Sequence, residues 1–389
     1  MHKIIKFIII LVLLFFVGYY FYSNPLWRLN NSSKFSLTSI TSVLDTKIDL
    51  NKNLIYSSTF QIAWNESYKL LKETIEIENA PEYVSQLNNL IDQPIILNQK
   101  AYIAMAGTKK ENIIENINQN LKKDFYNTKF IKNLLFNDFE LLIYSYLEKN
   151  VMFEYNFENI DDEALTFKFG TTETKVLSFG IKNYRFHEDF LKHELLSKQV
   201  EILYWCNNNF FLNGCIVKLK SSLNDDVIIS TLPVEDTLKK TFVKIQKFID
   251  YQFDDYAYLH QVKNLAELLK SYDIIDVNFK ECNSLMIPKI NFMIFHSYDE
   301  LSNKKLLNLD LTHNNYYISN AIHDINFTIN KFGSKSESSP NRSTLFGSQY
   351  TPRPLHINGP FVIFIRKKSS ILPYFMAYIA NDELLEKYQ

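Results

Sequence analysis

Histidine and acidic side chains are the residues with which proteins most often bind metals or move protons, but here their spacing fits neither use. His187-Glu188 and His193-Glu194 form two similar pairs. Histidines six residues apart do not share one helical face, as residues four apart would, so solvated charges explain them better than metal ligands. The chain also lacks a Gly-rich phosphate loop, a Gly-x-Ser-x-Gly elbow and a paired-acid motif. We therefore expect no metal and no cofactor, and a binding protein rather than an enzyme.

Three cysteines are the other candidates for chemistry, and they too lack a functional pattern. Cys206, Cys215 and Cys282 are odd in number and have none of the short paired spacings of a zinc site or a redox pair. Cys206 and Cys215 could pair across a hairpin, but half-buried thiols are the preferred interpretation.

The most patterned segment is a pair of strands separated by a long loop. Apolar and polar residues alternate strictly over Ile325–Asn330, as in a strand with one buried face, and Gly333 follows. The next convincing element is the apolar strand Phe361–Ile365, which starts after Pro360 and pairs with Tyr374–Ile379 in a closing hairpin. A loop this long in a compact domain is more often functional than not. Its chemistry would be that of an exposed backbone which a protease can cut.

The remaining elements should position this loop. Helical spacing of apolar residues predicts helices over 59–75, 110–125 and 234–250. Further strands are predicted where β-branched and aromatic residues gather between turn residues, namely Leu141–Leu147, Ala164–Phe169, Val176–Phe179, Val200–Trp205 and Phe210–Leu219. Helices thus come mainly early and strands mainly late, which predicts an α+β fold.

Composition is compatible with one large folded domain. The chain has 389 residues, of which 46% are hydrophobic and 22% charged, the balance of a globular protein. Its net charge of −1 provides no basic field for nucleic acid. No linker-like stretch divides residues 46–389, so we expect one domain there, with the polar residues 23–45 as a tether.

The first 22 residues predict a membrane anchor. Lys3 and Lys6 flank a stretch, Ile4–Val17, that is apolar apart from Lys6, and tyrosines follow it. Roughly 20 residues in a helix span the ~30 Å hydrocarbon core, and tyrosines suit the outer headgroup region. A cleaved signal peptide is the alternative, although the aromatic residues after the stretch fit a cleavage site poorly. In either case the bulk of the chain lies outside the cytoplasm, as a single-pass membrane protein or as a secreted one.

Several segments in the last third resemble the serpin family. Gly359–Arg366 followed by Ile371–Met376 resembles the closing serpin hairpin, with Ala377 where the family has glycine. Ile287–Phe292 with Ser297–Leu301 is similar to the serpin strand Leu-Pro-Lys-Phe and its Ser-Tyr-Asp-Leu continuation. Ala321–Gly333 resembles the strand that leads into the serpin reactive loop, although Lys331 and Phe332 replace two acids there.

Two earlier segments also resemble serpins, and the matches come in the family's order. Asn53–Ser58 is similar to the start of an early helix, and Ile143–Leu147 with Phe153 and Phe157 to the central strand, where Phe153 replaces a tryptophan. The resemblance implies a serpin-like fold, with a large mixed β-sheet, further sheets, helices and an exposed reactive loop over residues 333–359.

The resemblance also implies a mechanical function. In serpins a protease cuts the loop, whose first half then inserts into the main sheet as a new strand and carries the trapped protease with it. Gly333, Ser334, Ser336 and Ser338 would form the hinge, with the three serines on the core face and Lys335 and Glu337 facing solvent. This pattern permits insertion.

Other features of the loop count against rapid insertion. Buried serine hydroxyls need hydrogen-bond acceptors, and Pro340 removes one ladder hydrogen bond from a new strand. Protease inhibition and a non-inhibitory binding or structural role at the cell envelope both stay open.

The family's usual loop length places the scissile bond among Phe346, Gly347, Ser348 and Gln349. Phe346 suits a chymotrypsin-like protease, and Arg342, which lies earlier, would suit a trypsin-like one. The implied partner is an extracellular or periplasmic protease of the serine type, or alternatively of the cysteine type. We expect the protein to be a monomer that contacts the membrane through its N-terminal helix.

Overall fold

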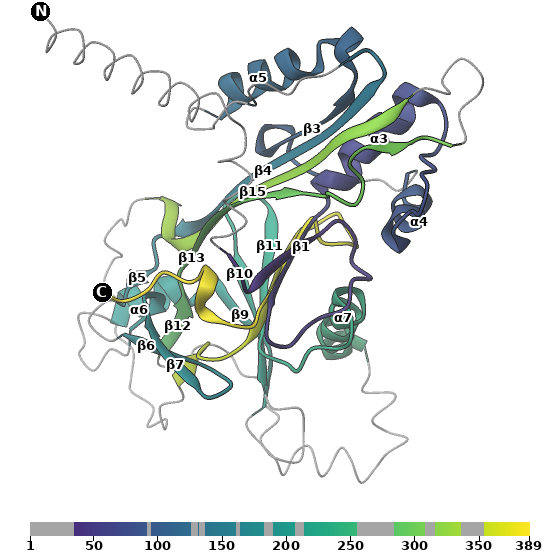
Figure 1. Ribbon diagram of the computed structural model, residues 1–389. Helices are drawn as coiled ribbons and strands as arrows, with labels where there is room; N and C mark the ends of the chain where they lie inside the picture. Colours follow the sequence, from purple (N-terminus) through teal and green to yellow (C-terminus); the bar gives the residue numbers. More distant parts are fainter. Residues whose placement is uncertain are drawn as a thin grey trace, which may run out of the picture.

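A computed structural model of the chain describes residues 35–91, 95–125, 131, 137–160, 164–182, 190–206, 214–254, 284–307, 316–335 and 354–389. Within these ranges the fold is α+β, as predicted, with β-sheets that helices cover (Figure 1). The predicted anchor, residues 1–22, lies outside them. Among the described residues no helix is both long and apolar enough to cross a membrane.

The first sheet has seven strands and contains the predicted closing hairpin. In spatial order they are β1 (Thr38–Thr41), β2 (Asn53–Ser57), β18 (Phe375–Ile379), β17 (Phe361–Lys367), β11 (Asp225–Ser230), β10 (Gly214–Lys220) and β9 (Val200–Cys206). Every residue of β18 and the first five of β17 are buried, which explains why they read as continuous apolar runs. Helix α7 (Leu238–Asp254) covers one face of this sheet through Leu238, Phe242 and Ile245.

The second sheet has five strands and supports the start of the predicted loop. Its main order is β13 (Ile290–Ser297), β15 (Tyr317–Lys335), β4 (Glu140–Tyr155) and β3 (Tyr102–Gly107), and β14 (Lys304–Lys305) adds to β15. Helix α3 (Thr59–Leu71) packs on one face and helix α5 (Ile113–Asp124) on the other (Figure 1). The helix predicted over 59–75 thus ends earlier, at Leu71, because Lys72 adopts a left-handed conformation (φ 62°) that closes it.

Two smaller sheets and two further helices complete the described fold. The four-stranded sheet has the order β16 (Pro354–His356), β12 (Ser284–Pro288), β8 (Ser178–Ile181) and β5 (Glu158–Asn159), and β6 (Leu165–Phe169) pairs with β7 (Thr172–Val176). Helices α4 (Glu82–Asn89) and α6 (Phe190–Ser197) flank the sheets. The predicted strand Val176–Phe179 is divided between β7 and β8.

Two predicted boundaries need correction. Residues 38–41, predicted to belong to the tether, form β1, which pairs in parallel with β2, and Val43 is buried. The segment is polar because it is an edge strand, which needs little apolar surface. The loop region predicted over 333–359 is also shorter, because β15 continues to Lys335 and β16 starts at Pro354.

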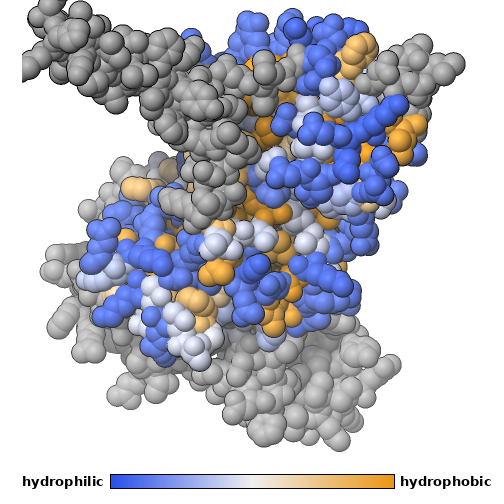
Figure 2. All heavy atoms as spheres, viewed as in Figure 1, coloured by the Kyte–Doolittle hydropathy of each residue, from blue (hydrophilic) through white to orange (hydrophobic). Residues whose placement is uncertain are grey.

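Cys215 is a free buried thiol that lies opposite Trp205 in the β9–β10 ladder. Burial raises the pKa of this thiol to about 11, so it is protonated and unreactive at neutral pH. Figure 2 shows a face on which hydrophilic side chains predominate among the described residues, with hydrophobic ones exposed in small groups between them.

Candidate functional site

The candidate site is the junction between β4 and β15, from whose end the predicted loop departs. The two strands pair in parallel from Tyr317 opposite Glu140 to Lys335 opposite Tyr155. Their outer neighbours, β3 and β13, pair with them antiparallel. A strand that followed β15 after a tight reversal would run antiparallel to both β15 and β4. The junction therefore has the geometry to accept one more strand, which would replace a parallel ladder with two antiparallel ones.

The far end of the junction is irregular. The register shifts between Ile329, opposite Val151, and Gly333, opposite Phe153, so β15 bulges over Asn330–Phe332. Side chains and backbone from the end of β4 fasten this bulge: Gly333 N donates to Asn156 Oδ1 (2.7 Å) and Phe157 N donates to Lys331 O (2.8 Å).

Gly333 is required there by close approach of the two backbones. A Cβ on Gly333 would lie 2.3 Å from the carbonyl carbon of Tyr155 and 2.6 Å from the nitrogen of Asn156, well inside contact distance. The predicted hinge glycine thus allows β15 to stay beside β4 beyond the bulge.

The structure places only the first predicted loop residues. Gly333 is half-buried in β15 and Ser334 follows it in the same strand, exposed. Ser336, Ser338, Arg342, Phe346, Gly347, Ser348 and Gln349 lie outside the described residues. Within Gly333–Lys335 the chain continues along β4 without reversing.

The other end of the loop is anchored in a different sheet. Strand β16 pairs in parallel with β12, with Leu355 opposite Leu285, and Leu355 is buried. Ile357 N donates to Met286 O (2.9 Å), which extends this attachment. Residues 336–353 therefore connect an end of the five-stranded sheet to an edge of the four-stranded one.

Helix α5 braces the junction from one side. Its Ile113, Ile117 and Leu121 pack on Leu142 and Tyr144 of β4 and, with them, on Ile322 of β15. On the same face Tyr144 donates a hydrogen bond to Asp324 Oδ2 (3.0 Å), so the two strands are also joined through side chains. Separation of β4 from β15 must disturb this packing.

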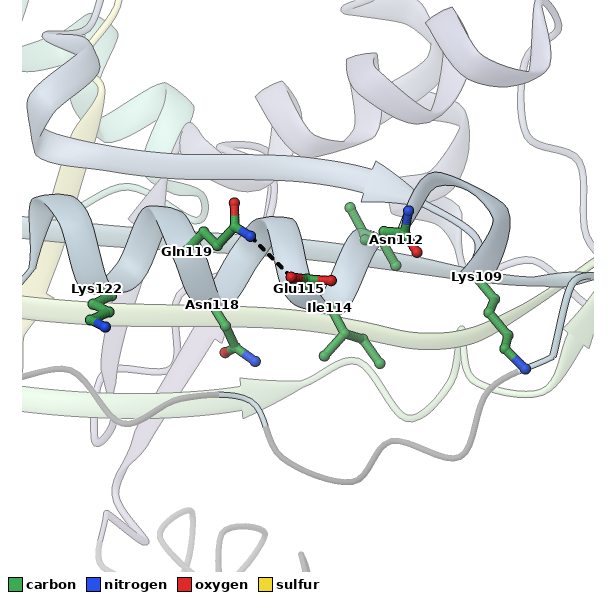
Figure 3. Close-up of a pocket in the computed structure, with 8 residues that line it drawn as sticks. Lys109, Asn112, Ile114, Glu115, Asn118, Gln119 and Lys122 are labelled. Carbon is green, nitrogen blue, oxygen red and sulfur yellow. Dashed lines mark hydrogen bonds between the residues drawn. The ribbon is translucent and has the colours of Figure 1, made fainter.

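The outer side of α5 carries a shallow hollow of about 500 Å³ (Figure 3). Lys109, Glu115, Gln119 and Lys122 line it, and Gln119 Nε2 donates to Glu115 Oε1 (3.1 Å). Its polar side chains are accessible to water and contact one another, so the hollow is a solvated helix surface.

His323 lies at the centre of the junction, on the opposite face from α5. Its ring nitrogens contact Thr59 Oγ1 (Nε2, 3.2 Å) at the start of α3 and the Tyr298 hydroxyl (Nδ1, 3.3 Å) after β13. Across the parallel ladder it faces Ser145, whose buried Oγ has no hydrogen-bond partner. Full burial lowers the pKa of His323 to about 3, so the imidazole is neutral at physiological pH.

A buried ion cluster joins the five-stranded sheet to the seven-stranded one. Asp225 on β11 contacts Lys149 of β4 (Nζ to Oδ2, 2.5 Å) and Lys367 of β17 (Nζ to Oδ1, 2.6 Å). The Tyr374 hydroxyl also donates to Asp225 Oδ2 (3.0 Å). Burial lowers the pKa of Lys149, while its carboxylate partner counteracts that shift. The cluster holds β4 to the sheet behind it.

Sequence reasoning identified Gly333 but missed His323, Ser145 and Asp225. His323 carried a usable signal, since it shares the buried face of its strand with Ala321 and Ile325, and a histidine there needs polar partners. Asp225 carried no such signal in the sequence, because its lysine partners are distant from it along the chain. The described residues contain no group of side chains that could hold a metal ion.

Comparison with known proteins gives a likeness of structure. No protein-family profile and no curated protein sequence matches the chain. Mouse protein-Z dependent protease inhibitor is 14% identical, with a TM-score of 0.47 over 85% of this chain and 91% of that one. Protease nexin-1 solved with heparin is 11% identical (TM-score 0.46, 85% and 92% covered). Serpin48 from the insect Tenebrio molitor is 8% identical (TM-score 0.43, 85% and 92% covered). These three proteins are what the chain is similar to in structure, and the sequence identities to all of them are low.

Proposed function

We propose that this chain is a serpin-like inhibitor of serine-type proteases, anchored by residues 1–22 on the outer side of a membrane, which acts by loop cleavage and insertion. The observation that carries the proposal is the parallel pairing of β4 with β15. The loop leaves from the end of β15, next to the one junction among the described strands of this sheet where an inserted strand would make antiparallel ladders on both sides.

The energetics favour insertion after cleavage. While the loop is intact, β16 holds its far end in the four-stranded sheet. Cleavage frees residues 334 onward from that anchor. The new strand forms ladder hydrogen bonds on both of its sides, while the parallel ladder between β4 and β15 is lost. The net gain is about one ladder, at about 1 kcal/mol for each hydrogen bond, which outweighs the cost of a few buried serine hydroxyls.

The proposal makes no use of catalysis by this chain. The attacking protease supplies the chemistry: its nucleophilic serine or cysteine forms an ester or thioester with the loop residue that precedes the cut, and insertion interrupts hydrolysis of that bond. Phe346 directs a chymotrypsin-like protease to the loop, and Arg342 a trypsin-like one.

Complex formation tests this function directly. The purified residues 35–389 are incubated with a chymotrypsin-like or a trypsin-like protease and separated by denaturing electrophoresis. We expect a band of the summed mass with the chymotrypsin-like protease, which Phe346→Ala abolishes and Arg342→Ala leaves intact. A clean nick without a band of summed mass, for both proteases, contradicts inhibition.

A non-inhibitory binding or structural role at the cell envelope is the second candidate. The observation that favours it is the strength of the closed junction, which pairs as far as Lys335 and is fastened at Gly333 and Lys331. A closed junction slows insertion, and a protease is trapped only when insertion is faster than hydrolysis. The nicked, uncomplexed product in the same experiment is the result expected for this role.

A further inference from the structure

Large apolar side chains are exposed together at one end of the seven-stranded sheet. The turn between β17 and β18 and the turn between β10 and β11 meet there, because Lys367 at the end of β17 pairs with Asp225 at the start of β11. The segment before β3 borders the same place. The exposed residues, which we call the turn patch, are Ile371 (83%), Leu223 (48%), Leu372 (44%) and Ile96 (42%).

Two adjoining hollows that share Tyr374 connect the members of the turn patch. The hollow of about 380 Å³ has Ile96 and Leu372 on its wall, and the hollow of about 220 Å³ has Leu223. Lys367 Nζ also donates to Leu223 O (3.4 Å), which holds the two turns together. The turn patch is therefore one surface, and grouped apolar residues of this kind mark interaction sites where scattered ones do not.

Lysines outnumber acids around the turn patch. Lys100 and Lys368 are both exposed, and neither forms an ion pair with any residue that the structure describes. The charged residues of the two turns, their flanking strand ends and the smaller hollow are Lys100, Lys149, Lys220, Lys367 and Lys368 against Asp124, Glu148 and Asp225. Asp225 is already neutralised by two of these lysines. The surface thus complements an anionic partner.

Apolar side chains on exposed turns, with lysines beside them, fit an anionic bilayer. The apolar groups can enter the boundary between headgroups and acyl chains, and the lysine ammonium groups can stay at the level of the lipid phosphates. Each lysine that reaches such a surface strengthens the contact.

The length of the chain before the described residues is compatible with this contact. Residues 23–34, which follow the predicted anchor, span at most about 40 Å when fully extended. The backbone from Phe35 to Val43, which lines the larger hollow, spans at most about 27 Å. An anchor at residues 1–22 therefore allows the turn patch to reach the same bilayer, and it would keep the local concentration of that surface high.

We infer that the turn patch docks the folded body on an anionic phospholipid bilayer, with Ile371 and Leu372 among the acyl chains and Lys100 and Lys368 among the headgroups. The choice of a bilayer as the partner rests on the anchor proposed for residues 1–22. Docking fixes which side of the body faces the membrane, and hence which side is open to a protease.

Tryptophan reporters in the full-length chain test this orientation. The protein is added to vesicles of phosphatidylcholine and phosphatidylglycerol with brominated acyl chains, which quench tryptophan, and the emission of the unchanged chain is subtracted. Ile371→Trp is the reporter in the turn patch. Leu50→Trp is the control, because Leu50 is also exposed (64%) and lies at the opposite end of β2.

The control is stringent because Leu50 is close to the start of β1. Asn381 Nδ2 donates to both Leu37 O (3.4 Å) and Asn51 O (3.0 Å). A body held by its tether alone would bring Leu50 nearer to the bilayer than Ile371. We expect the opposite, namely loss of emission from Ile371→Trp and little loss from Leu50→Trp.

Charge variants test the lipid preference. In the Ile371→Trp chain, Lys368→Gln should lower the ratio of docked to undocked body about fivefold, while Lys52→Gln, near Leu50, should leave it unchanged. Replacing phosphatidylglycerol with phosphatidylcholine should have a larger effect than either variant. Equal quenching in both lipids would overturn the assignment to an anionic surface.

A carbonate wash separates failure of the docking from failure of the anchor. If the chain stays on the vesicles after the wash and Ile371→Trp is quenched no more than Leu50→Trp, the anchor stands and the docking is overturned. If Ile371→Trp is quenched but the wash removes the chain, the turn patch binds lipid and the anchor is wrong. A chain that neither stays nor shows quenching overturns both.

Discussion

His323 on β15 and Ser145 on β4 face each other across the parallel ladder, at the middle of the junction that insertion would have to open. Both are fully buried, and neither has a charged partner: His323 contacts two hydroxyls, and Ser145 Oγ contacts no partner. The centre of the junction is therefore polar but uncharged, and protonation of His323 would place an unpaired charge in the core.

This arrangement predicts a loss of stability in mild acid. The pKa of His323 is about 3 in the folded protein and about 6.5 when unfolded, so between these values the unfolded chain binds the proton. Stability is unaffected by His323 above pH 6.5 and should fall by about 1 kcal/mol per pH unit below it. His323→Gln, which stays neutral, should flatten this part of the curve in urea unfolding measured from pH 7 to pH 4.

A variant of His296, which lies on β13 and is only partly buried, provides the comparison for this prediction. Burial also lowers the pKa of His296, so His296→Gln should remove a smaller part of the same slope. If the unfolding free energy of His323→Gln falls with decreasing pH as steeply as that of the unchanged protein, then carboxylates, and not this imidazole, cause the loss of stability in acid.

Gly333→Ala tests whether the end of β15 is held against β4. The added methyl would lie 2.3 Å from the Tyr155 carbonyl carbon, so the strand end must move away. We expect a loss of about 1–3 kcal/mol in unfolding free energy and faster hydrogen exchange at the Gly333 and Phe157 amides.

Gly359→Ala is its matched control, because a methyl there would meet nothing closer than 3.5 Å, an ordinary contact. Equal effects of the two substitutions would indicate that Gly333 serves chain flexibility alone.

Many of the individual strands can be predicted from local sequence patterns, but which strands pair with each other cannot. Strict alternation over Ile325–Asn330 was sufficient to predict that part of β15, where one face is buried. The apolar run Phe361–Ile365 was sufficient to predict β17, which is buried on both faces. The extension of β15 to Lys335 could not be predicted, because it depends on Asn156 and on backbone contact at Gly333. The parallel partnership of β15 with β4 likewise joins segments about half the chain apart.

The candidate site likewise contains residues that could be predicted from the sequence and residues that could not. Gly333 stood out from its position after an alternating strand. Asp225, by contrast, comes next to a second aspartate after Asn224 and reads as part of a solvated turn, yet its exposed fraction is 1%. Only the fold brings Lys149 and Lys367 to it.

Asp225→Asn should be strongly destabilising. Both lysines would remain in the cluster without their carboxylate, and the loss of one partner from a buried pair costs about 3–5 kcal/mol. Asp236→Asn, which breaks an ion pair with Lys240 whose side chains are both 62% exposed, should cost less than about 1 kcal/mol. Chemical unfolding of the two variants makes the comparison, and similar losses would show that Asp225 is compensated by water or by rearrangement.

The final prediction concerns loop cleavage, because insertion of the cut loop should change the stability of the protein even when no protease is trapped. If the cut loop enters between β4 and β15, the sheet gains a strand and the melting temperature of the cleaved protein should exceed that of the intact one. Pro340 lies in the part of the loop that would insert, where it lacks the N–H that the ladder needs. Pro340→Ala should therefore raise the melting temperature of the cleaved form further and leave the intact form unchanged, as scanning calorimetry before and after limited proteolysis would measure. A cleaved protein that melts at the same temperature as the intact one, with and without Pro340, would mean that β4 and β15 stay closed and would leave the binding or structural role as the function.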